Sequence, residues 1–98
     1  MSKAKMEYEW DSEKAELNLE KHGVGFDEAV TVVDDLFNID FYDPKHSLEE
    51  HRFLVVGESN LPRLLIVSYT ERDDKIRIIS ARELTAQERK NYEHGKFE

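Results

Sequence analysis

The sequence of 98 residues contains no cysteine, only two prolines and only four glycines. Without cysteine it cannot form a disulfide framework or a thiolate metal site. No apolar run approaches the length of a membrane span, and the first six residues lack the apolar stretch of a secretory signal. These absences predict a soluble, cytoplasmic protein with a single domain over 1–98, frayed at 1–7 and 94–98.

Arginine is missing from the first half of the chain. Residues 1–51 hold five Lys and 14 Asp or Glu, whereas all six Arg lie in residues 52–98. The formal net charge of −8 argues against binding of bulk duplex DNA, because phosphate binding normally requires a basic surface. A local basic site in the second half is still possible, and the acidic half suits a basic partner.

Hydrophobic spacing and capping residues predict an α+β fold in the order α-α-β-β-β-β-α. Asp11 is a good N-cap for the first helix, Gly23 suits the left-handed position that closes it, and Thr85 with Glu88 has the form of a capping box. The expected helices cover 12–21, 26–33 and 85–92, and the expected strands cover 36–41, 52–57, 64–70 and 76–82. Short links predict an antiparallel four-stranded sheet with the helices on one side.

The last expected strand carries an arginine near each end, Arg77 and Arg82, and Arg72 lies in the turn before it. A guanidinium group matches phosphate oxygens with two parallel hydrogen bonds, so cations on a rigid strand favour a phosphate ligand. The alternative is that these arginines pair with the abundant carboxylates. Without a bulge, Arg77 and Arg82 point to opposite faces of the sheet.

Other polar residues are more ambiguous. His22 ends the first helix beside Lys21, where it is either a general acid or base or a capping residue. His46 and His94 fall in a loop and in the tail, and both are expected to be solvated. Tyr69 is either a core residue or a stacking platform for single-stranded RNA. No metal site is predicted, because Glu49, Glu50 and His51 are adjacent in sequence and point in different directions.

Several motifs occur together in a characteristic order. They are Trp10-Asp11, Lys14, Asn18, Lys21-His22-Gly23-Val24, Phe26-Asp27-Glu28-Ala29, Asp34-Asp35, Asp43-Pro44, His51-Arg52-Phe53, Gly57, Tyr69-Thr70-Glu71-Arg72, Arg77-Ile78-Ile79-Ser80-Ala81-Arg82, Glu88-Arg89 and Tyr92. Each piece is weak alone, but the ordered set resembles the BrnT family from about Tyr8 to Tyr92.

The resemblance implies a toxin of a type II toxin–antitoxin pair with a RelE-like fold. It implies metal-independent cleavage of RNA without a cofactor, and neutralisation by a BrnA-like antitoxin that carries a ribbon-helix-helix portion. Operator DNA is then bound only through the antitoxin, and no membrane is involved. Carried over by matching positions, the catalytic residues are Lys21, His22, Arg72, Arg77 and Arg82, and the RNA-binding residues are Arg52, Glu71 and Tyr69.

A second interpretation remains open from the residues themselves. The strongly acidic composition is unusual beside an RNA-binding surface. A non-catalytic interaction domain that binds an antitoxin-like or regulatory partner is therefore the alternative to an endoribonuclease.

Overall fold

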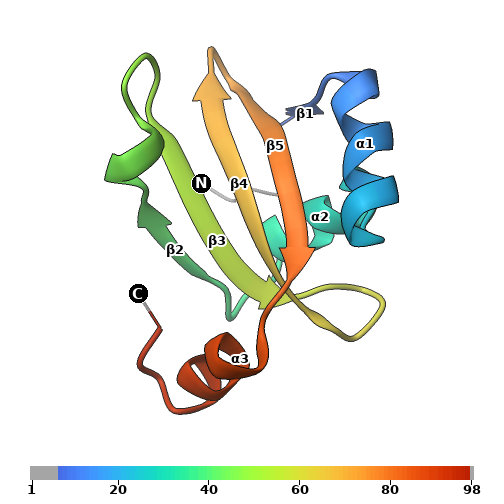
Figure 1. Cartoon of the computed structure of the whole chain (residues 1–98). Helices are drawn as coiled ribbons and strands as arrows, with labels where there is room; N and C mark the ends of the chain where they lie inside the picture. Colours follow the sequence, from blue (N-terminus) through green and yellow to red (C-terminus); the bar gives the residue numbers. More distant parts are fainter. Residues whose placement is uncertain (1–6, 98) are drawn as a thin grey trace.

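The computed structural model describes residues 7–97, which form three α-helices, one short 3-10 helix and a five-stranded sheet (Figure 1). The strands lie in the order β1-β5-β4-β3-β2. In chain order the elements are β1 (Glu7–Glu9), α1 (Ser12–His22), α2 (Phe26–Val33), β2 (Ile39–Tyr42), the 3-10 helix η2 (Pro44–His46), β3 (Arg52–Glu58), β4 (Leu64–Arg72), β5 (Lys75–Glu83) and α3 (Ala86–Glu93). The α+β class is therefore confirmed.

The local signals for helix ends are confirmed. The Asp11 side chain accepts a hydrogen bond from the Lys14 backbone N–H at 3.1 Å, and Gly23 closes α1 with a φ of 71°. Thr85 and Glu88 form both halves of a capping box at the start of α3. These bonds satisfy N–H groups that the first turn of a helix leaves without an internal partner, and each helix begins and ends within one residue of the prediction.

The predicted sheet was wrong in one strand, because β1 adds a parallel edge to an otherwise antiparallel sheet. Residues Glu7–Glu9 pair with Lys75–Arg77 of β5. The segment has only one apolar side chain, Tyr8, which packs against the core, so it has no alternating pattern to reveal it. Glu7, which was expected to be frayed, is part of this strand, and residues 1–6 lie outside the described part of the chain.

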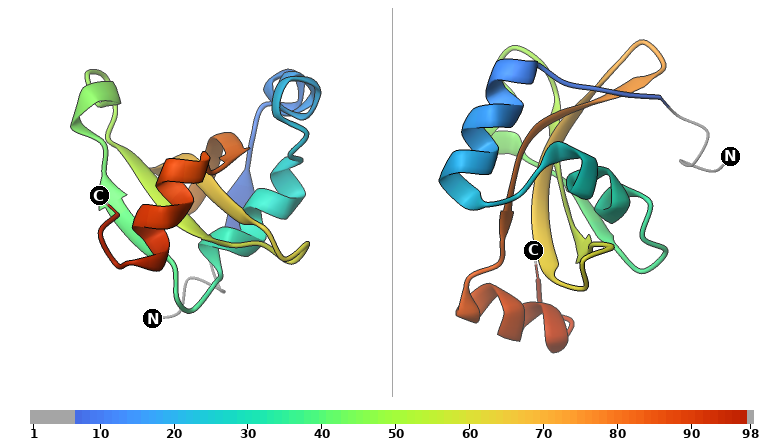
Figure 2. Two further views of the ribbon diagram at one scale, coloured as in Figure 1. Left: turned by 60° about the horizontal axis from the view of Figure 1, so that its bottom comes forward. Right: turned by 90° about the vertical axis from the view of Figure 1, so that its right-hand side faces the viewer.

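The helices do not all lie on one side of the sheet, contrary to the prediction. Helix α2 lies on one side, where the main core contains Phe26, Val32 and Val67, and α1 lies along the edge of β5. Helix α3 lies against one end of the opposite face, where Tyr92 packs with the buried Ile66. Figure 2 shows α3 across the sheet from α2. The rest of the second face is left open between α1, α3 and η2.

The strand expected over 36–41 begins later, at Ile39, and ends at Tyr42. Leu36 and Phe37 are instead exposed in a turn that closes α2. Asn38 donates from Nδ2 to the carbonyls of Val32 and Val33 at 3.1 and 2.9 Å, which satisfies the end of that helix. The turn approaches β3 at Gly57, where a Cβ atom would lie 2.8 Å from the Asp35 carboxylate.

A β-bulge brings the two arginines of β5 to the same face. Ser68 pairs with Ser80 but the next residue, Tyr69, pairs with Ile78, so Ile79 is an extra residue in β5. Ile76 and Ile78 on one side of the bulge, and Ala81 on the other, belong to the same core. Arg77 and Arg82 alternate with those residues and therefore both lie on the open face.

Candidate active site

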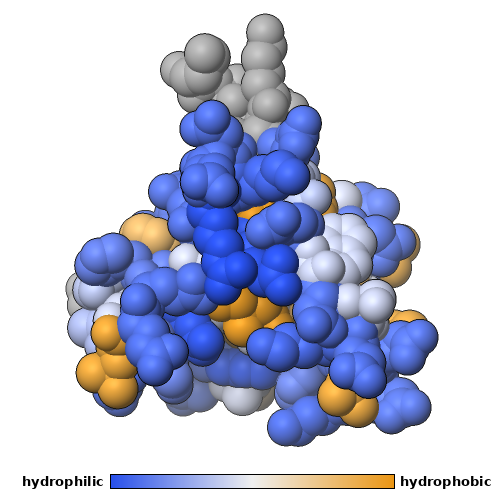
Figure 3. Space-filling model, turned by 90° about the horizontal axis from the view of Figure 1, so that it is seen from above, coloured by the Kyte–Doolittle hydropathy of each residue, from blue (hydrophilic) through white to orange (hydrophobic). Residues whose placement is uncertain are grey.

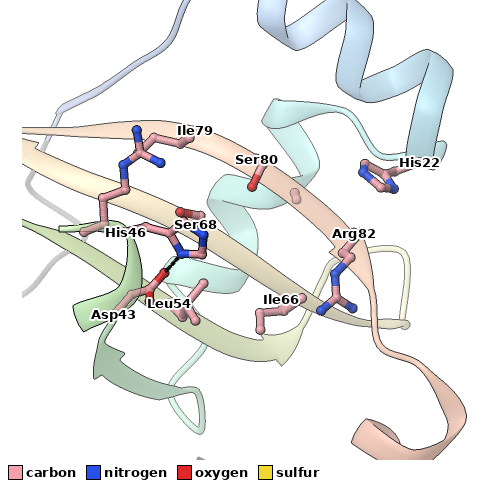
Figure 4. Close-up of a pocket in the computed structure, with 11 residues that line it drawn as sticks. His22, Asp43, His46, Leu54, Ile66, Ser68, Ile79, Ser80 and Arg82 are labelled. Carbon is pink, nitrogen blue, oxygen red and sulfur yellow. Dashed lines mark hydrogen bonds and ion pairs between the residues drawn. The ribbon is translucent and has the colours of Figure 1, made fainter. Parts of the chain in front are cut away.

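The open face contains a cleft of about 380 Å³, whose floor is formed by β3, β4 and β5. Leu54, Ile66, Ser68 and Ser80 contribute to this floor. His22 lies at the α1 side, and Asp43 and His46 come from the opposite side, where β2 leads into η2 (Figure 4). Arg52 and Arg82 also line the cleft. Titratable and cationic side chains from distant parts of the sequence thus meet around one hollow.

His22 reaches the cleft because Asn18 fixes α1 to the edge of β5. The buried Asn18 side chain donates to the Ala81 carbonyl at 2.8 Å and accepts from the Ala81 N–H at 3.1 Å. It also donates to the Val24 carbonyl at 2.9 Å. Lys21 precedes His22 but is exposed and does not line this cleft. It lines a shallower hollow beside it, together with His22.

His46 is held by a carboxylate, although it was expected to be simply solvated. Its Nδ1 lies 2.8 Å from Oδ2 of Asp43, and the Asp43 side chain is only 10% exposed. Figure 4 shows this pair on the side of the cleft opposite His22. The prediction missed both residues because Asp43 entered it only as part of the Asp43-Pro44 motif, with nothing to connect it to His46. An Asp three residues before a His across a proline turn is the pattern that would have revealed the pair.

Arg52 differs from the other arginines of the sheet because no carboxylate pairs with it among residues 7–97. Its Nε atom is buried and has no hydrogen-bond partner. The residue lines the cleft and also a second hollow of about 290 Å³ that His46 shares. A buried donor without an acceptor lowers the stability of a fold, and an oxygen of a ligand or of a water molecule supplies such an acceptor.

Arg72 and Arg77 lie beside Arg52 and are paired. Arg52, Thr70 and Arg77 are in register across β3, β4 and β5. Arg72 donates from Nε to Glu50 at 3.1 Å, and Arg77 lies 3.3 Å from Glu9 of β1. The pKa of Glu50 is lowered, first by the hydrogen bond from Arg72 and also by the charges of Arg52 and Arg77. Three guanidinium groups therefore lie near Glu50 at this end of the open face, and of these three only Arg52 lines the cleft.

Arg82 lies at the other end of the cleft and has a structural partner. Its guanidinium donates two hydrogen bonds to the Glu88 carboxylate, at 2.8 and 3.0 Å. Glu88 also accepts from the Thr85 N–H at 2.9 Å as part of the capping box. These bonds, with that from Arg82 the strongest cause, lower the pKa of Glu88 to about 2. Arg82 thus connects β5 to α3. The negative charge of Glu88 weakens the attraction of Arg82 for an anionic ligand.

This ion pair gives a prediction about acid stability. The pKa of Glu88 is lower in the folded protein than in the unfolded chain. Its contribution to the free energy of unfolding is therefore present above about pH 4.5 and is lost as the pH falls towards 2. The change Glu88→Gln is expected to cost about 1 kcal/mol at pH 7, since it removes a charge-assisted but partly exposed pair. Urea unfolding at several pH values should show the two proteins converging near pH 2. A difference that stays constant down to pH 2 contradicts the assignment.

The remaining two predicted RNA-binding residues, Tyr69 and Glu71, lie on the face of the sheet opposite the cleft. Tyr69 is 2% exposed and stacks against Phe53 in the core, and its hydroxyl donates to Asp40 at 2.7 Å. Burial and this acceptor raise the pKa of Tyr69. Glu71 follows on the same side of β4 and does not line the cleft. Stacking of RNA on Tyr69 does not fit this placement, because alternation in β4 directs its ring towards the helices.

The end of the molecule with the β4–β5 turn and the 43–51 loop is predominantly hydrophilic. Figure 3 views this end, and apolar atoms appear there in small separate areas. Among residues 7–97 no group of three or more His, Asp or Glu side chains has a metal-binding arrangement. None of the helices in this range is long and apolar enough to cross a membrane.

Comparison with known proteins identifies the family. The sequence profile described as "Ribonuclease toxin, BrnT, of type II toxin-antitoxin system" matches residues 10–88. The chain belongs to the BrnT family. The match covers both walls of the cleft, from His22 on α1 to Arg82 on β5, and extends to Glu88 on α3. Comparison with curated protein sequences gave no match.

A solved structure supports the fold of this BrnT chain. It is the crystal structure at 1.1 Å resolution of the Brucella abortus ribonuclease toxin BrnT, and it matches with a TM-score of 0.61 and 22% identity. The alignment covers 82% of this chain and 97% of that chain. At this identity the likeness shows a shared fold. The family description supplies the context, a ribonuclease toxin within a toxin–antitoxin system.

Proposed function

We propose that this BrnT chain cuts RNA at the cleft of the open face and is neutralised by a BrnA-like antitoxin. The observation that carries the proposal is Arg52, a partly buried cation whose Nε has no acceptor and which lines a cleft with two histidines. A phosphate group supplies the oxygen acceptors that this guanidinium lacks. The family description supports RNA as the source of that phosphate.

The proposed reaction is internal transfer at phosphorus. The ribose 2′-oxygen forms a bond to the adjacent phosphorus while the bond from phosphorus to the 5′-oxygen breaks, which leaves a 2′,3′-cyclic phosphate and a 5′-hydroxyl. One proton leaves the 2′-hydroxyl and one is delivered to the 5′-oxygen. Arg52, Arg72 and Arg77 supply the positive charge that stabilises the five-coordinate phosphate, so the proposal requires no metal ion.

The other predicted residues take supporting roles in this proposal. His22 is the proton donor at the α1 side of the cleft, and Lys21 adds positive charge beside it. Arg82 helps to position the substrate, although its pair with Glu88 weakens its attraction for phosphate. To bind the substrate, Arg72 must release Glu50 and Arg77 must release Glu9. Both ion pairs are partly exposed to solvent, so breaking them costs little free energy.

The antitoxin is proposed to bring operator DNA to the complex. A formal net charge of −8 disfavours direct contact between this chain and DNA, and favours a basic segment in the partner. A specific observation supports the alternative of a non-catalytic interaction domain: Arg72, Arg77 and Arg82 are each paired with a carboxylate. The two functions differ in whether RNA is destroyed.

Induction of the chain in a bacterial host, alone or with the neighbouring antitoxin gene, separates these functions. We expect growth arrest and fragmentation of cellular RNA when the chain is induced alone, because the cleft is then accessible. Co-induction of the antitoxin should restore both growth and intact RNA. Arrest with fully intact RNA supports the interaction domain and contradicts the ribonuclease.

A further inference from the structure

The cleft contains a second proton-transfer group that the motif comparison does not assign. We propose that His46, oriented by Asp43, is the general base that removes the proton from the 2′-hydroxyl. The inference rests on the proposed ribonuclease function and assigns the general base, which the proposed reaction requires and the motif comparison does not supply. Internal transfer needs one group to remove a proton and another to deliver one, on opposite sides of phosphorus. The predicted site supplies His22 on one side only.

The hydrogen bond between Asp43 and His46 determines the role of the ring. A carboxylate only accepts, so the Nδ1 of His46, at 2.8 Å from Asp43 Oδ2, must carry the proton. In the neutral ring the lone pair then lies on Nε2, which is the atom that can accept a proton. Asp43 is well placed to fix this tautomer, because its side chain is 10% exposed whereas that of His46 is 65% exposed.

The surrounding backbone holds Asp43 firmly. Its N–H donates to the Arg52 carbonyl at 2.9 Å, which continues the pairing of β2 with β3. Its carbonyl accepts from the Ser47 hydroxyl at 2.5 Å, and that hydroxyl accepts from the Arg52 N–H at 3.0 Å. The general base and the cation that binds phosphate are therefore connected through the same short stretch of backbone.

The location of His46 suits proton transfer at a phosphate held by Arg52. The two residues line both the cleft and the neighbouring hollow, so they lie side by side between the two. His22 lies beyond β5, on the other side of three strands. The charged or titratable groups that face His46 are Asp43 and Lys45 from its own turn, Glu49 and Glu50 from the following loop, Arg52 from β3, and His22 and Arg82 across the cleft.

Cleavage of two matched RNAs by purified variants tests the assignment. One RNA is ordinary, and the other carries sulfur in place of the 5′-oxygen at the cleaved linkage. The sulfur leaves as a thiolate and needs no proton, so it removes the need for a general acid while the need for a base remains. We expect His46→Ala to lose about 10²–10⁴-fold in kcat/KM on both RNAs. His22→Ala should lose activity on ordinary RNA and recover it on the sulfur RNA.

Two further measurements distinguish a base from a structural residue. A general base acts only in its unprotonated form, so the rising acid limb of the wild-type pH–rate profile should be absent in His46→Ala. The change Asp43→Asn keeps the ring but no longer requires the proton on Nδ1, so it should reduce activity while the melting temperature changes little. His94→Ala is the matched control, because His94 is exposed and does not line the cleft.

The outcomes separate this inference from the proposed function. If wild-type protein cuts RNA and His46→Ala cuts it within a few-fold of the same rate, the assignment of His46 is wrong and the ribonuclease function stands. Recovery of His46→Ala, but not His22→Ala, on the sulfur RNA would reverse the two roles and also overturn it. A wild-type protein that leaves both RNAs intact contradicts the proposed function itself, and the inference falls with it.

Discussion

Replacing Arg52 by methionine is expected to reduce RNA cleavage by at least about 10²-fold, the usual effect of removing one preorganised charge at a transition state. The same change should leave the melting temperature equal or higher. Its Nε is a buried donor without an acceptor, and removal of such a group relieves a desolvation cost. Methionine keeps an apolar stem of similar length. Cleavage assays and thermal unfolding on the same protein samples test both halves.

Arg89→Met is the matched control for this prediction. Arg89 is exposed on α3, has no ion pair among residues 7–97 and does not line the cleft, so its removal takes away the same charge from another place. We expect it to retain full activity. Equal losses in the two variants would mean that only the overall charge matters. A large fall in melting temperature for Arg52→Met would mean that Arg52 supports the fold and has no special place in the site.

Glu28→Ala is expected to cause the largest loss of stability, about 3 kcal/mol in the free energy of unfolding, because it leaves a partly buried guanidinium with only the half-exposed Glu83 as a carboxylate partner. Glu28 is 7% exposed and accepts from Arg63 at 2.6 and 2.8 Å and from Ser59 at 2.6 Å. Arg63 also donates to the Gly23 carbonyl at 2.9 Å and to Glu83 at 3.0 Å. This network connects the end of α1, α2, the β3–β4 turn and β5.

Urea unfolding at pH 7 measures this effect, with Glu20→Ala as the control. Glu20 is exposed on α1 and has no ion pair among residues 7–97, so its loss should change stability by less than about 0.5 kcal/mol. Hydrogen bonding from Arg63 lowers the pKa of Glu28, so the stabilisation is present above about pH 4.5 and is lost as the pH falls through the folded value. Equal stability of the two variants at pH 7 would contradict the network.

Features that depend on neighbouring residues were predictable from the sequence. Asp11, Gly23 and the pair Thr85 and Glu88 define helix ends through contacts within one turn, and the structure has all of them. The three central strands were also located, because their apolar runs are bounded by polar turns. By contrast β1 has one apolar residue and forms only because β5 offers a free edge. Pairing between distant segments leaves little trace in a three-residue stretch.

The candidate site shows the same difference between features set by neighbouring residues and features set by contacts between distant segments. The bulge at Ile79 cannot be inferred from β5 alone, since it is a mismatch in length between β4 and β5, yet it decides that Arg77 and Arg82 share a face. The sequence left Tyr69 open between the core and RNA stacking, because apolar residues occupy both sides of β4 and hide the alternation. The pairing of His46 with Asp43 was missed because it joins two side chains across a proline turn. Arg52 was found by matching motifs, but its lack of an ion pair is visible only in three dimensions.

The most direct test of the central claim is cleavage of an RNA in which a single 2′-hydroxyl, at the cleaved position, is replaced by hydrogen. The RNA should be presented both free and on ribosomes, with a chelator added to parallel samples. Attack by the 2′-oxygen predicts that the substituted position is not cut, that ordinary RNA leaves a 2′,3′-cyclic phosphate and a 5′-hydroxyl, and that the chelator changes nothing. Cleavage at the deoxy position, or fragments with 5′-phosphate ends, would contradict the account.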